Sequence, residues 1–408
     1  MPKYDVAVIG AGLGGLAAAA LLSSRKKKII VLDPSGSLNQ ALGVFEKDGF
    51  FFASTPTLSY GFQRGEAIHE FSANLGITHD ISVNSPCYQV ALPDKRITVF
   101  AEQGETLEEL RREFPGEISR LEKFYRDLHV IALRNARNRL SAYVSDHRTG
   151  FIKKYGFSRE LTAFLDIQSL WFFQKPAAEL SLSSLIMLCD TSPTYLHGGF
   201  KKFADWMYSI ILQQGGEVRY GEDAQGIEIR DGHVVGVRTG KSGLVEADTI
   251  LMNTVPTQHM PRLFMGLRDE VVPVGMCQEV LFLPDYTKPR HFAALSLSAR
   301  DDINSAPEGM RALTASFRSE KAPQDDTAAS LKSIGRLIPF LEDFLVFAEK
   351  GRGRDSEIVL PADVTFKKSG AEDVIFRSSK RNVYRLNDSP MAPLQVISAV
   401  QKFVKKMK

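Results

Sequence analysis

The sequence predicts an α/β protein, and three observations support this prediction. Residues 4–33 run as a buried strand, a glycine-rich turn, an apolar helix and a second buried strand that ends on an acid. A β-hairpin signal and another buried strand follow within residues 224–253. The last segment, residues 382–407, again encodes a strand, a turn and a helix. Buried strands that alternate with helices favour a mainly parallel sheet covered by helices.

The opening segment carries the pattern of a dinucleotide-binding turn. Val6–Ile9 and Ile29–Leu32 are short apolar runs of the kind found in buried parallel strands. Between them, three glycines have the spacing G-x-G-x-x-G: Gly10, Gly12 and Gly15. They permit a tight turn, close approach to a pyrophosphate and packing of helix on strand, and the helix N-terminus favours phosphate. Asp33 is placed to accept hydrogen bonds from ribose hydroxyls. We therefore predict a Rossmann-type FAD/NAD(P)-binding domain, and the acid argues against the 2′-phosphate of NADP.

The composition is that of an ordinary globular protein. The 408 residues suffice for two or three domains, and 44% of them are apolar and 24% charged. The net charge is +3 and basic residues cluster only at residues 25–28 and 402–408, so a nucleic-acid-binding face is not predicted. The 3 cysteines form no CxxC pair, which predicts no metal site, no disulfide framework and a reducing, cytoplasmic location. Neither a membrane-spanning run nor a signal peptide is expected.

Local signals predict several elements in the middle of the chain. Thr106 and Glu109 have the spacing of a capping box at the start of a helix. Gly215–Gly216 suits the C-terminal end of a helix that begins near residue 199. Asp231–Gly232 suits a type I′ turn between alternating strands, and Val245–Asn253 returns as a buried strand.

The segment Leu161–Leu188 is markedly apolar and leaves two interpretations open. It contains three consecutive aromatic residues, Trp171, Phe172 and Phe173, which cannot all face one core if they lie on one helix. One interpretation is a buried junction between helices. The other is an apolar substrate channel or a patch that touches a membrane. Together with the basic tail, the second interpretation predicts peripheral membrane contact.

Four blocks of the chain resemble the phytoene desaturase and amine oxidase-like flavoprotein superfamily, with the carotenoid desaturase and isomerase group as the nearest branch. They are Val44–Leu58, Gly198–Gly240, Pro307–Phe317 and Arg336–Phe347. The resemblance implies FAD as the cofactor and hydride transfer between flavin and an apolar substrate, such as an isoprenoid. It also places the backbone around Ala224 near the adenine. The cofactor-binding residues that we predict are Gly10, Gly12, Leu13, Gly14, Gly15, Asp33, Pro34, Asn39, Gln40, Ala224 and Asp388.

The resemblance also implies two interleaved domains. Residues 1–85, 195–265 and 361–408 are predicted to form the FAD-binding domain. Residues 86–194 and 266–360 are predicted to form an α+β substrate domain, and the sequence shows no internal repeat or long linker between the two.

The chain departs from the family at three places on the flavin side of the predicted site. The family carries Gly-Gly-Arg after the ribose acid, where this chain has Asn39–Ala41. It carries an acid and a glycine where this chain has Ala53–Thr55. Near the end it has Gly-Asp followed by a glycine turn, where this chain has Asn387–Asp388 and then Pro390 and Pro393. A proline removes an N–H donor that would otherwise reach the flavin.

Three further residues were weighed for chemistry. Asp388 matches a family aspartate that binds ribityl or phosphate, and the alternative is a helix cap. His197, just before a glycine pair, is either a residue that faces the flavin or an ordinary surface or core histidine. Cys189 lies in an apolar run and is expected to be a small buried hydrophobe.

Three functions stay open from the sequence. The first is an FAD oxidoreductase with an apolar substrate, which needs no conspicuous acid or base. The second is a non-catalytic protein that binds a nucleotide or a lipid on the same fold, suggested by the departures on the flavin side. The third and weakest is an NAD-dependent enzyme that uses only the first motif. Neither a catalytic residue nor an oligomeric state is predicted.

Overall fold

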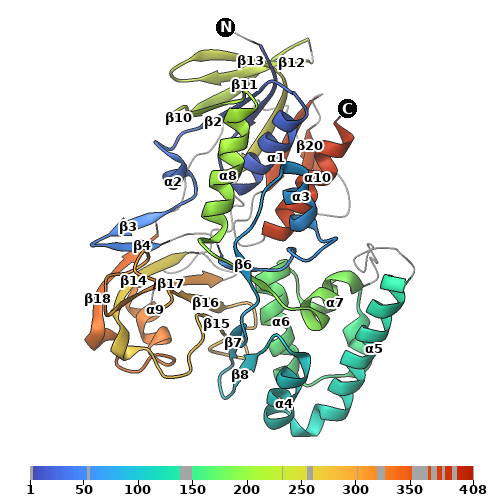
Figure 1. The fold of residues 1–408 in the computed structure, drawn as a ribbon, viewed down its shortest axis with the longest axis vertical. Helices are drawn as coiled ribbons and strands as arrows, with labels where there is room; N and C mark the ends of the chain where they lie inside the picture. Colours follow the sequence, from blue (N-terminus) through green and yellow to red (C-terminus); the bar gives the residue numbers. More distant parts are fainter. Residues whose placement is uncertain are drawn as a thin grey trace.

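The computed structural model describes residues 3–52, 56–137, 149–231, 233–254, 261–300, 302–318, 327–351, 366–368, 375–378, 382–387 and 393–407. Its main parts are a large sheet with its helices, a second sheet and a helical lobe (Figure 1). Both chain ends belong to the first part, and the other two lie side by side beneath it (Figure 1). The predicted α/β fold with a Rossmann-type domain is confirmed.

The large sheet is built on five parallel strands in the order β10–β2–β1–β13–β21. Antiparallel β20 and β19 extend it at one edge, and the hairpin β11–β12 pairs with β13. The strands are β1 (Tyr4–Ile9), β2 (Ile29–Asp33), β10 (Glu217–Tyr220), β11 (Ala224–Arg230), β12 (His233–Thr239), β13 (Gly243–Thr254), β19 (Phe366–Lys368), β20 (Ile375–Ser378) and β21 (Val383–Asn387). The buried parallel strands predicted at 6–9 and 29–32 are confirmed, as are the strand predicted at 245–253, where Glu246 and Asp248 are exposed, and a strand in the C-terminal segment.

The hairpin and the helix end predicted from glycines are also confirmed. Arg230 pairs with His233 across a two-residue turn, and Asp231 has the left-handed φ of 51° that such a turn requires. Its partner in the turn, Gly232, lies outside the described residues. Gly215 has φ +80° just after the end of the preceding helix, and Gly216 N–H donates to the Ile211 carbonyl at 2.8 Å.

Helices cover the inner face of the large sheet. They are α1 (Leu13–Ser24), α3 (Ala67–Leu75), α8 (Gly199–Gln213) and α10 (Pro393–Lys406). Helix α1 packs against both α8 and α10, and all its residues from Leu13 to Ser23 are buried. A helix that is apolar all round must be covered all round, which explains why its sequence shows no polar face. Pro393 occupies the first position of α10, where a missing N–H costs nothing.

The second sheet has the order β18–β14–β17–β16–β15–β7–β8. Its strands are β7 (Tyr88–Ala91), β8 (Arg96–Val99), β14 (Arg262–Arg268), β15 (Glu279–Phe282), β16 (Phe292–Leu297), β17 (Met310–Arg318) and β18 (Leu345–Lys350). On one face, Val280 and Leu295 pack in a core with Ile334, the last residue of α9 (Thr327–Ile334). On the other face, Leu281 and Ala294 belong to the core that also contains α1 and α10. This core also includes side chains of the helical lobe, so the second face is turned toward the rest of the molecule.

The domain division stays a prediction. Strand β14, residues 262–268, belongs wholly to the second sheet, although the predicted boundary at residue 265 falls inside it. Short strands link the two parts: the hairpin β3 (Phe45–Lys47) with β4 (Phe50–Phe52), and the small sheet β5 (Leu58–Ser59), β9 (Thr194–Leu196) and β6 (Ile81–Ser82).

The helical lobe corrects one prediction. It contains α4 (Gln103–Glu113), α5 (Ile118–Arg137), α6 (Arg159–Phe173) and α7 (Leu182–Asp190). Helix α4 begins four residues before the predicted start, since its N-cap is Glu102 and not Thr106, and Glu102 makes no side-chain cap bond. Thr106 and Glu109 instead accept backbone N–H groups of the preceding strand region, from Phe100 at 2.9 Å and Thr98 at 3.3 Å. The predicted capping box was wrong, because these two side chains connect the helix to the end of β8 and do not cap the helix itself.

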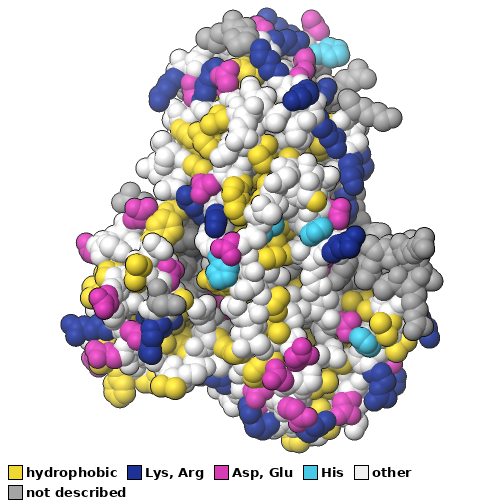
Figure 2. Space-filling model, in the orientation of Figure 1, with side chains coloured by type: hydrophobic (Ala, Val, Ile, Leu, Met, Phe, Trp, Pro, Cys, Tyr) yellow, Lys and Arg dark blue, Asp and Glu magenta, His cyan; other side chains and the backbone are white. Residues whose placement is uncertain are grey.

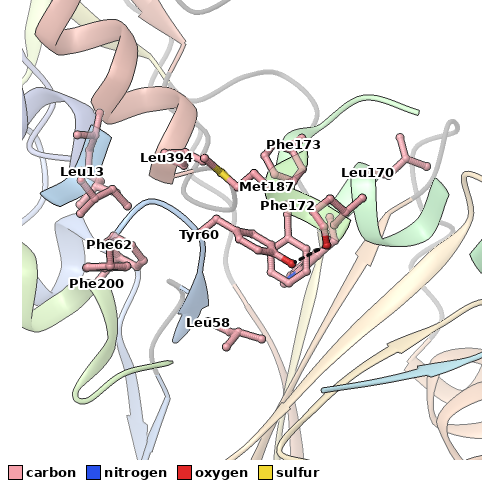
Figure 3. Packing of buried hydrophobic residues seen from close by; sticks show 14 of the residues in the cluster. Leu13, Leu58, Tyr60, Phe62, Leu170, Phe172, Phe173, Met187, Phe200 and Leu394 are labelled. Atoms are coloured by element: carbon pink, nitrogen blue, oxygen red, sulfur yellow. Dashed lines mark hydrogen bonds between the residues drawn. The ribbon is translucent and has the colours of Figure 1, made fainter. Parts of the chain in front are cut away.

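The three consecutive aromatic residues are all buried, so the prediction that they cannot share one core was wrong. Trp171, Phe172 and Phe173 are 6%, 7% and 5% exposed. They occupy the C-terminal turn of α6, where Tyr60 packs against both Phe172 and Phe173 at ring-centroid distances of 5.0 and 5.7 Å (Figure 3). Other elements surround this turn on several sides, which favours a buried helix junction over a membrane-touching patch.

The surface carries charges of both signs. On the lower part of the face in Figure 2, acidic and basic side chains are interspersed. In the part of the chain that the structure describes, no helix combines the length and the apolar composition that crossing a bilayer requires. The cytoplasmic location stays a prediction.

Candidate nucleotide and substrate site

The turn after β1 has the geometry that its glycines predict. Gly10 has φ +102°, and a Cβ there would lie 2.6 Å from the carbonyl oxygen of Asn253 on β13. A Cβ on Gly15 would lie 2.1 Å from the carbonyl oxygen of Gly10. Neither position accepts a side chain unless the backbone moves. The turn is thereby held at the carboxyl edge of the parallel strands, where open α/β sheets bind ligands.

The N-terminus of α1 carries no capping side chain. Gly12 is its N-cap, with extended backbone at φ −69° and ψ 176° and no side-chain cap bond. The first turn of the helix and the positive end of its dipole are thus not blocked by a cap. This arrangement suits a pyrophosphate group.

Leu13 and Gly14 have packing roles in addition to their place in the turn. The Leu13 side chain is 2% exposed. A Cβ on Gly14 would lie 2.6 Å from Leu386 Cδ2 on β21 and 2.8 Å from Val396 Cγ1 on α10. The missing side chain of Gly14 therefore lets the C-terminal segment pack against α1, while Leu13 is buried.

Asp33 is bound to the glycine turn itself. Its Oδ2 accepts the N–H of Ala11 at 2.6 Å, and its Oδ1 accepts the N–H of Ser35 at 2.8 Å. The side chain is 0% exposed. In this arrangement the carboxylate ties the end of β2 to the glycine turn, and its contact with a ribose stays a prediction. Pro34, the next predicted residue, is exposed.

The strand end beside Asp33 brings the predicted adenine neighbour into place. Gly221 N–H donates to the Ser35 carbonyl at 2.7 Å, and Ala224 then begins β11 as a buried residue. Tyr220 is the register partner of Asp33 in the β10–β2 pair. Its hydroxyl is buried without a hydrogen-bond partner, and burial raises the pKa of Tyr220. A bound nucleotide would give this hydroxyl the partner that it lacks.

Asn39 and Gln40 lie in a short helix, α2 (Leu38–Ala41). Ser37 caps it by accepting the N–H of Gln40 at 3.3 Å. The exposed Gln40 side chain folds back, and its Oε1 accepts the N–H of Gly36 at 2.8 Å. This chain therefore forms a capped helical turn where the resemblance implied a Gly-Gly-Arg segment. The departures at 53–55 and Pro390 lie outside the described residues, as does the predicted cofactor residue Asp388, and Asn387 is described only as the last residue of β21.

A buried acid that the sequence analysis missed lies on the second sheet. Glu279, the first residue of β15, is 8% exposed, and its Oε1 accepts hydrogen bonds from Thr57 at 2.7 Å and Ser296 at 2.6 Å. Burial raises the pKa of Glu279 to about 7, and the two hydroxyl donors limit the rise. The available signal was an acid at the start of the apolar run "EVLFL".

The two other residues weighed for chemistry are not brought to the glycine turn. His197 is exposed, its ring lies 5.1 Å from that of Tyr195, and its Nε2 is 3.2 Å from Ser82 Oγ. Cys189 packs against the main core, and burial raises the pKa of its thiol. A raised thiol pKa disfavours the reactive thiolate, as expected for a structural cysteine.

The comparisons with known proteins agree with this geometry. An NAD(P)-binding Rossmann-like domain matches residues 8–40. A prolycopene isomerase of Daucus carota is 24% identical over 336 residues, which cover 74% of this chain and 53% of the relative. A phytoene desaturase of Rhodobacter capsulatus is 25% identical over 272 residues, covering 60% of this chain and 51% of the relative. The chain is thus similar to members of the phytoene desaturase and carotenoid isomerase group. It spans about half the length of the curated relatives that it matches.

Solved structures share the fold over nearly the whole chain. An oxidoreductase of Methanosarcina mazei has a TM-score of 0.65 at 15% identity, covering 98% of this chain and 100% of its own. A Rab GDI of Plasmodium falciparum has a TM-score of 0.63 at 13% identity, covering 99% and 98%. At these identities the likeness establishes the fold alone, and proteins of different kinds share it.

The comparisons support FAD, and the described residues fit its adenosine end. The fit rests on three features. They are the N-terminus of α1, whose N-cap Gly12 has no side chain to block it, the glycine turn that excludes side chains, and the unpartnered hydroxyl of Tyr220. The backbone of the turn would hold the pyrophosphate, and the strand end that leads to Ala224 would lie beside the adenine. The individual cofactor contacts stay predictions.

Proposed function

We propose that this chain is an FAD-dependent oxidoreductase that transfers hydride between flavin and an apolar substrate of the isoprenoid class. The observation that carries the proposal is the glycine-capped, unblocked N-terminus of α1 at the carboxyl edge of the parallel sheet. The similarity to a prolycopene isomerase and a phytoene desaturase supports the substrate class.

The remaining parts of the molecule suit this chemistry. Flavin supplies an acceptor or donor for a hydride, and the protein must then position the substrate and keep water away. The second sheet turns an apolar face, with Leu281 and Ala294, toward the core that it shares with the nucleotide-binding part and the helical lobe. An apolar substrate needs such a surface, because most of its contacts are non-directional.

The visible absorption spectrum of the protein, purified without added cofactor, tests the proposal first. Bound flavin that is released as FAD on denaturation supports it, as does uptake of added FAD by colourless protein. Anaerobic mixing with phytoene in detergent micelles should then bleach the flavin band, and air should restore it. A protein that takes up no FAD contradicts the proposal.

A second candidate is a non-catalytic protein that binds a nucleotide or lipid on the same fold. It is favoured by Asp33 and Gln40, whose side chains bind the protein's own backbone. This candidate predicts bound ADP-like ligand, or lipid, in a protein without a flavin spectrum. Mass spectrometry of the denatured protein's supernatant separates the two candidates.

Peripheral membrane contact is a further proposal, with a narrower basis than the sequence suggested. The aromatic part of the apolar segment is buried, so the proposal rests on the basic end of α10, with Lys405 and Lys406 in its last turn. Sedimentation with vesicles of anionic and of neutral lipid tests it. Binding to anionic vesicles that is lost on charge reversal of these lysines supports the proposal. Protein that stays in the supernatant with both kinds of vesicle contradicts it.

A further inference from the structure

A row of polar residues crosses the apolar inner face of the second sheet. Glu279 on β15 is the register partner of Ser296 on β16, and Ser296 is the register partner of Thr314 on β17. Directly paired residues point to the same face of a sheet. Leu281 lies two residues after Glu279 on β15, and Ala294 lies two residues before Ser296 on β16. Both are buried in the main core.

The alternation along the strands fixes the direction of this row. Successive residues of a strand point to opposite faces. Val280 and Leu295, each one position away from the row, belong to the separate core on the far side of the sheet. Glu279 and its row therefore point to the side of the main core, where Glu279 meets Thr57 of the segment that links the two sheets.

Glu279 is held by neutral donors from two different parts of the chain. Ser296 lies on the neighbouring strand, whereas Thr57 lies just before β5, in the segment that links the two sheets. Among the described residues, no cationic side chain forms an ion pair with Glu279. A buried carboxyl group without a cation is costly to keep ionised, and groups whose pKa is shifted in this way cluster at functional sites.

The acid lies under residues that solvent or a ligand can reach. Thr57, Ser296, Thr314 and Tyr195 are all half-buried, while Glu279 itself is buried. Tyr195 on β9 is the titratable neighbour from the packed elements, and burial, followed by the charge of Glu279, raises its pKa to about 12. Tyr195 therefore stays neutral, and Glu279 is the group of this cluster that changes charge near neutral pH.

We propose that Glu279 is the proton acceptor of the substrate site, held in place by Thr57 and Ser296. This inference rests on the proposed function. In a substrate oxidation, one C–H bond breaks and its electron pair leaves with the hydrogen as hydride to the flavin. The neighbouring C–H bond breaks, its proton passes to the Glu279 carboxylate, and its electron pair forms the new C=C bond. The substrate loses two electrons and the flavin gains them, to be passed later to a two-electron acceptor of the quinone class.

The acid-base properties of Glu279 agree with this role. With a pKa of about 7, raised by burial, close to half of the groups are ionised at neutral pH and able to accept a proton. The protonated form then returns its proton to water through the half-buried residues around it. Loss of the Ser296 hydroxyl removes a donor that stabilises the ionised form, so Ser296→Ala should raise this pKa further.

The test uses the FAD-loaded, full-length protein as wild type, Glu279→Gln, Ser296→Ala and a control, Glu117→Gln. Glu117 is also a buried acid, 9% exposed, but it lies in the helical lobe and accepts the N–H of Ser158 at 2.9 Å. The first measurement is the flavin absorption spectrum between pH 5 and 9 without substrate. We expect a change with a midpoint near pH 7 that persists in Glu117→Gln, moves to higher pH in Ser296→Ala and is absent in Glu279→Gln.

The second measurement is the rate of anaerobic flavin reduction by phytoene in micelles across the same pH range. The wild-type rate should rise with pH to a plateau above the pKa, and Glu279→Gln should lower the plateau about 100-fold or more. A flavin spectrum that titrates alike in wild type and Glu279→Gln, a wild-type spectrum without a titration, or a rate within about threefold of wild type in Glu279→Gln overturns the inference.

The two proposals fail in different ways. A protein that binds no FAD refutes the proposed function, and the role of Glu279 with it. A protein that binds FAD and loses the spectral titration in Glu279→Gln, but is not reduced by phytoene, supports Glu279 as the acid at the flavin and refutes the tested substrate. Binding of FAD with reduction by phytoene at an unchanged rate in Glu279→Gln supports the function and refutes the inference.

Discussion

The two ends of the predicted FAD site are built in different ways. The adenosine end comes almost entirely from residues 9–35, one continuous segment, completed by the strand end before Ala224. The substrate end brings together Thr57, Glu279 and Ser296, which are far apart in the sequence. The first end is specified by backbone sterics and the second by burial of a charge. A motif scan can therefore find the first end, while the second becomes visible only after the chain is folded.

The largest expected effect is at the adenosine end, with Gly15→Ala. The new Cβ would lie 2.1 Å from the Gly10 carbonyl oxygen, so the backbone must move, and we expect a loss of about 3 kcal/mol or more in the free energy of unfolding. Chemical denaturation without nucleotide measures it. Gly104→Ala in α4 is the matched control, because a Cβ there meets nothing within 4 Å and should stabilise the helix slightly. Equal effects of the two substitutions would contradict the steric account.

The next prediction concerns the substrate end and pH. The pKa of Glu279 is about 7 in the folded protein and 4.5 in the unfolded chain. Between these values only the unfolded state loses the proton, so the stabilising effect of a neutral Glu279 is lost as the pH rises from 4.5 to about 7. The difference amounts to about 3 kcal/mol. Unfolding in urea at pH 5 and pH 8 should show this loss in the wild type and not in Glu279→Gln, whereas Ser296→Ala should keep it. The same pH dependence in Glu279→Gln would assign it to another group.

A smaller effect is expected for Asp33→Asn. The amide can accept only through its oxygen, so one of the two N–H groups, of Ala11 or Ser35, loses its acceptor in a buried place. We expect a loss of about 2 kcal/mol in unfolding free energy, already in nucleotide-free protein. Asp5→Asn is the control, since Asp5 also accepts a backbone N–H, from Lys28 at 2.7 Å, at an exposed site. If Asp33→Asn lowers only FAD affinity and leaves stability unchanged, Asp33 contacts the nucleotide as the sequence predicted.

The smallest effect is expected for Gln40→Ala. Its side-chain bond to the Gly36 N–H is exposed and short in range, so the unfolding free energy should change by about 0.5 kcal/mol. FAD affinity should change less than threefold, as in the control Gln214→Ala, whose side chain accepts from Lys26 at an exposed site. A tenfold loss of FAD affinity, measured by fluorescence titration, would show that Gln40 reaches the cofactor after all.

The sequence predicted most of the large sheet because its signals are local. The glycine spacing, the apolar runs of β1, β2 and β13, the Asp231 turn and the Gly215 helix end all depend on neighbours in sequence. The resemblance then extended these elements to the right fold. The capping-box prediction failed because Thr106 accepts the N–H of Phe100, just after the strand that precedes the helix, and does not cap the helix.

The parts of the site that escaped prediction depend on distant segments. Nothing around Asp33 in the sequence shows that its carboxylate accepts the N–H of Ala11. This hydrogen bond forms because the end of β2 lies beside the glycine turn in the folded protein. Glu279 was overlooked because an acid at a strand end is usually exposed. Its burial results from the second sheet turning that face toward the rest of the molecule.

The place of β21 and α10 has a consequence for how this protein is made. Leu386 on β21 and Val396 on α10 contact the backbone at Gly14, more than 300 residues earlier in the sequence, and β21 pairs with β13 in the centre of the sheet. During translation, α1 leaves the ribosome before β21 and α10, so one of its apolar flanks stays uncovered while more than 300 further residues emerge. The nascent chain exposes this apolar helix in that interval, and a chaperone that shields it would raise the yield of folded protein.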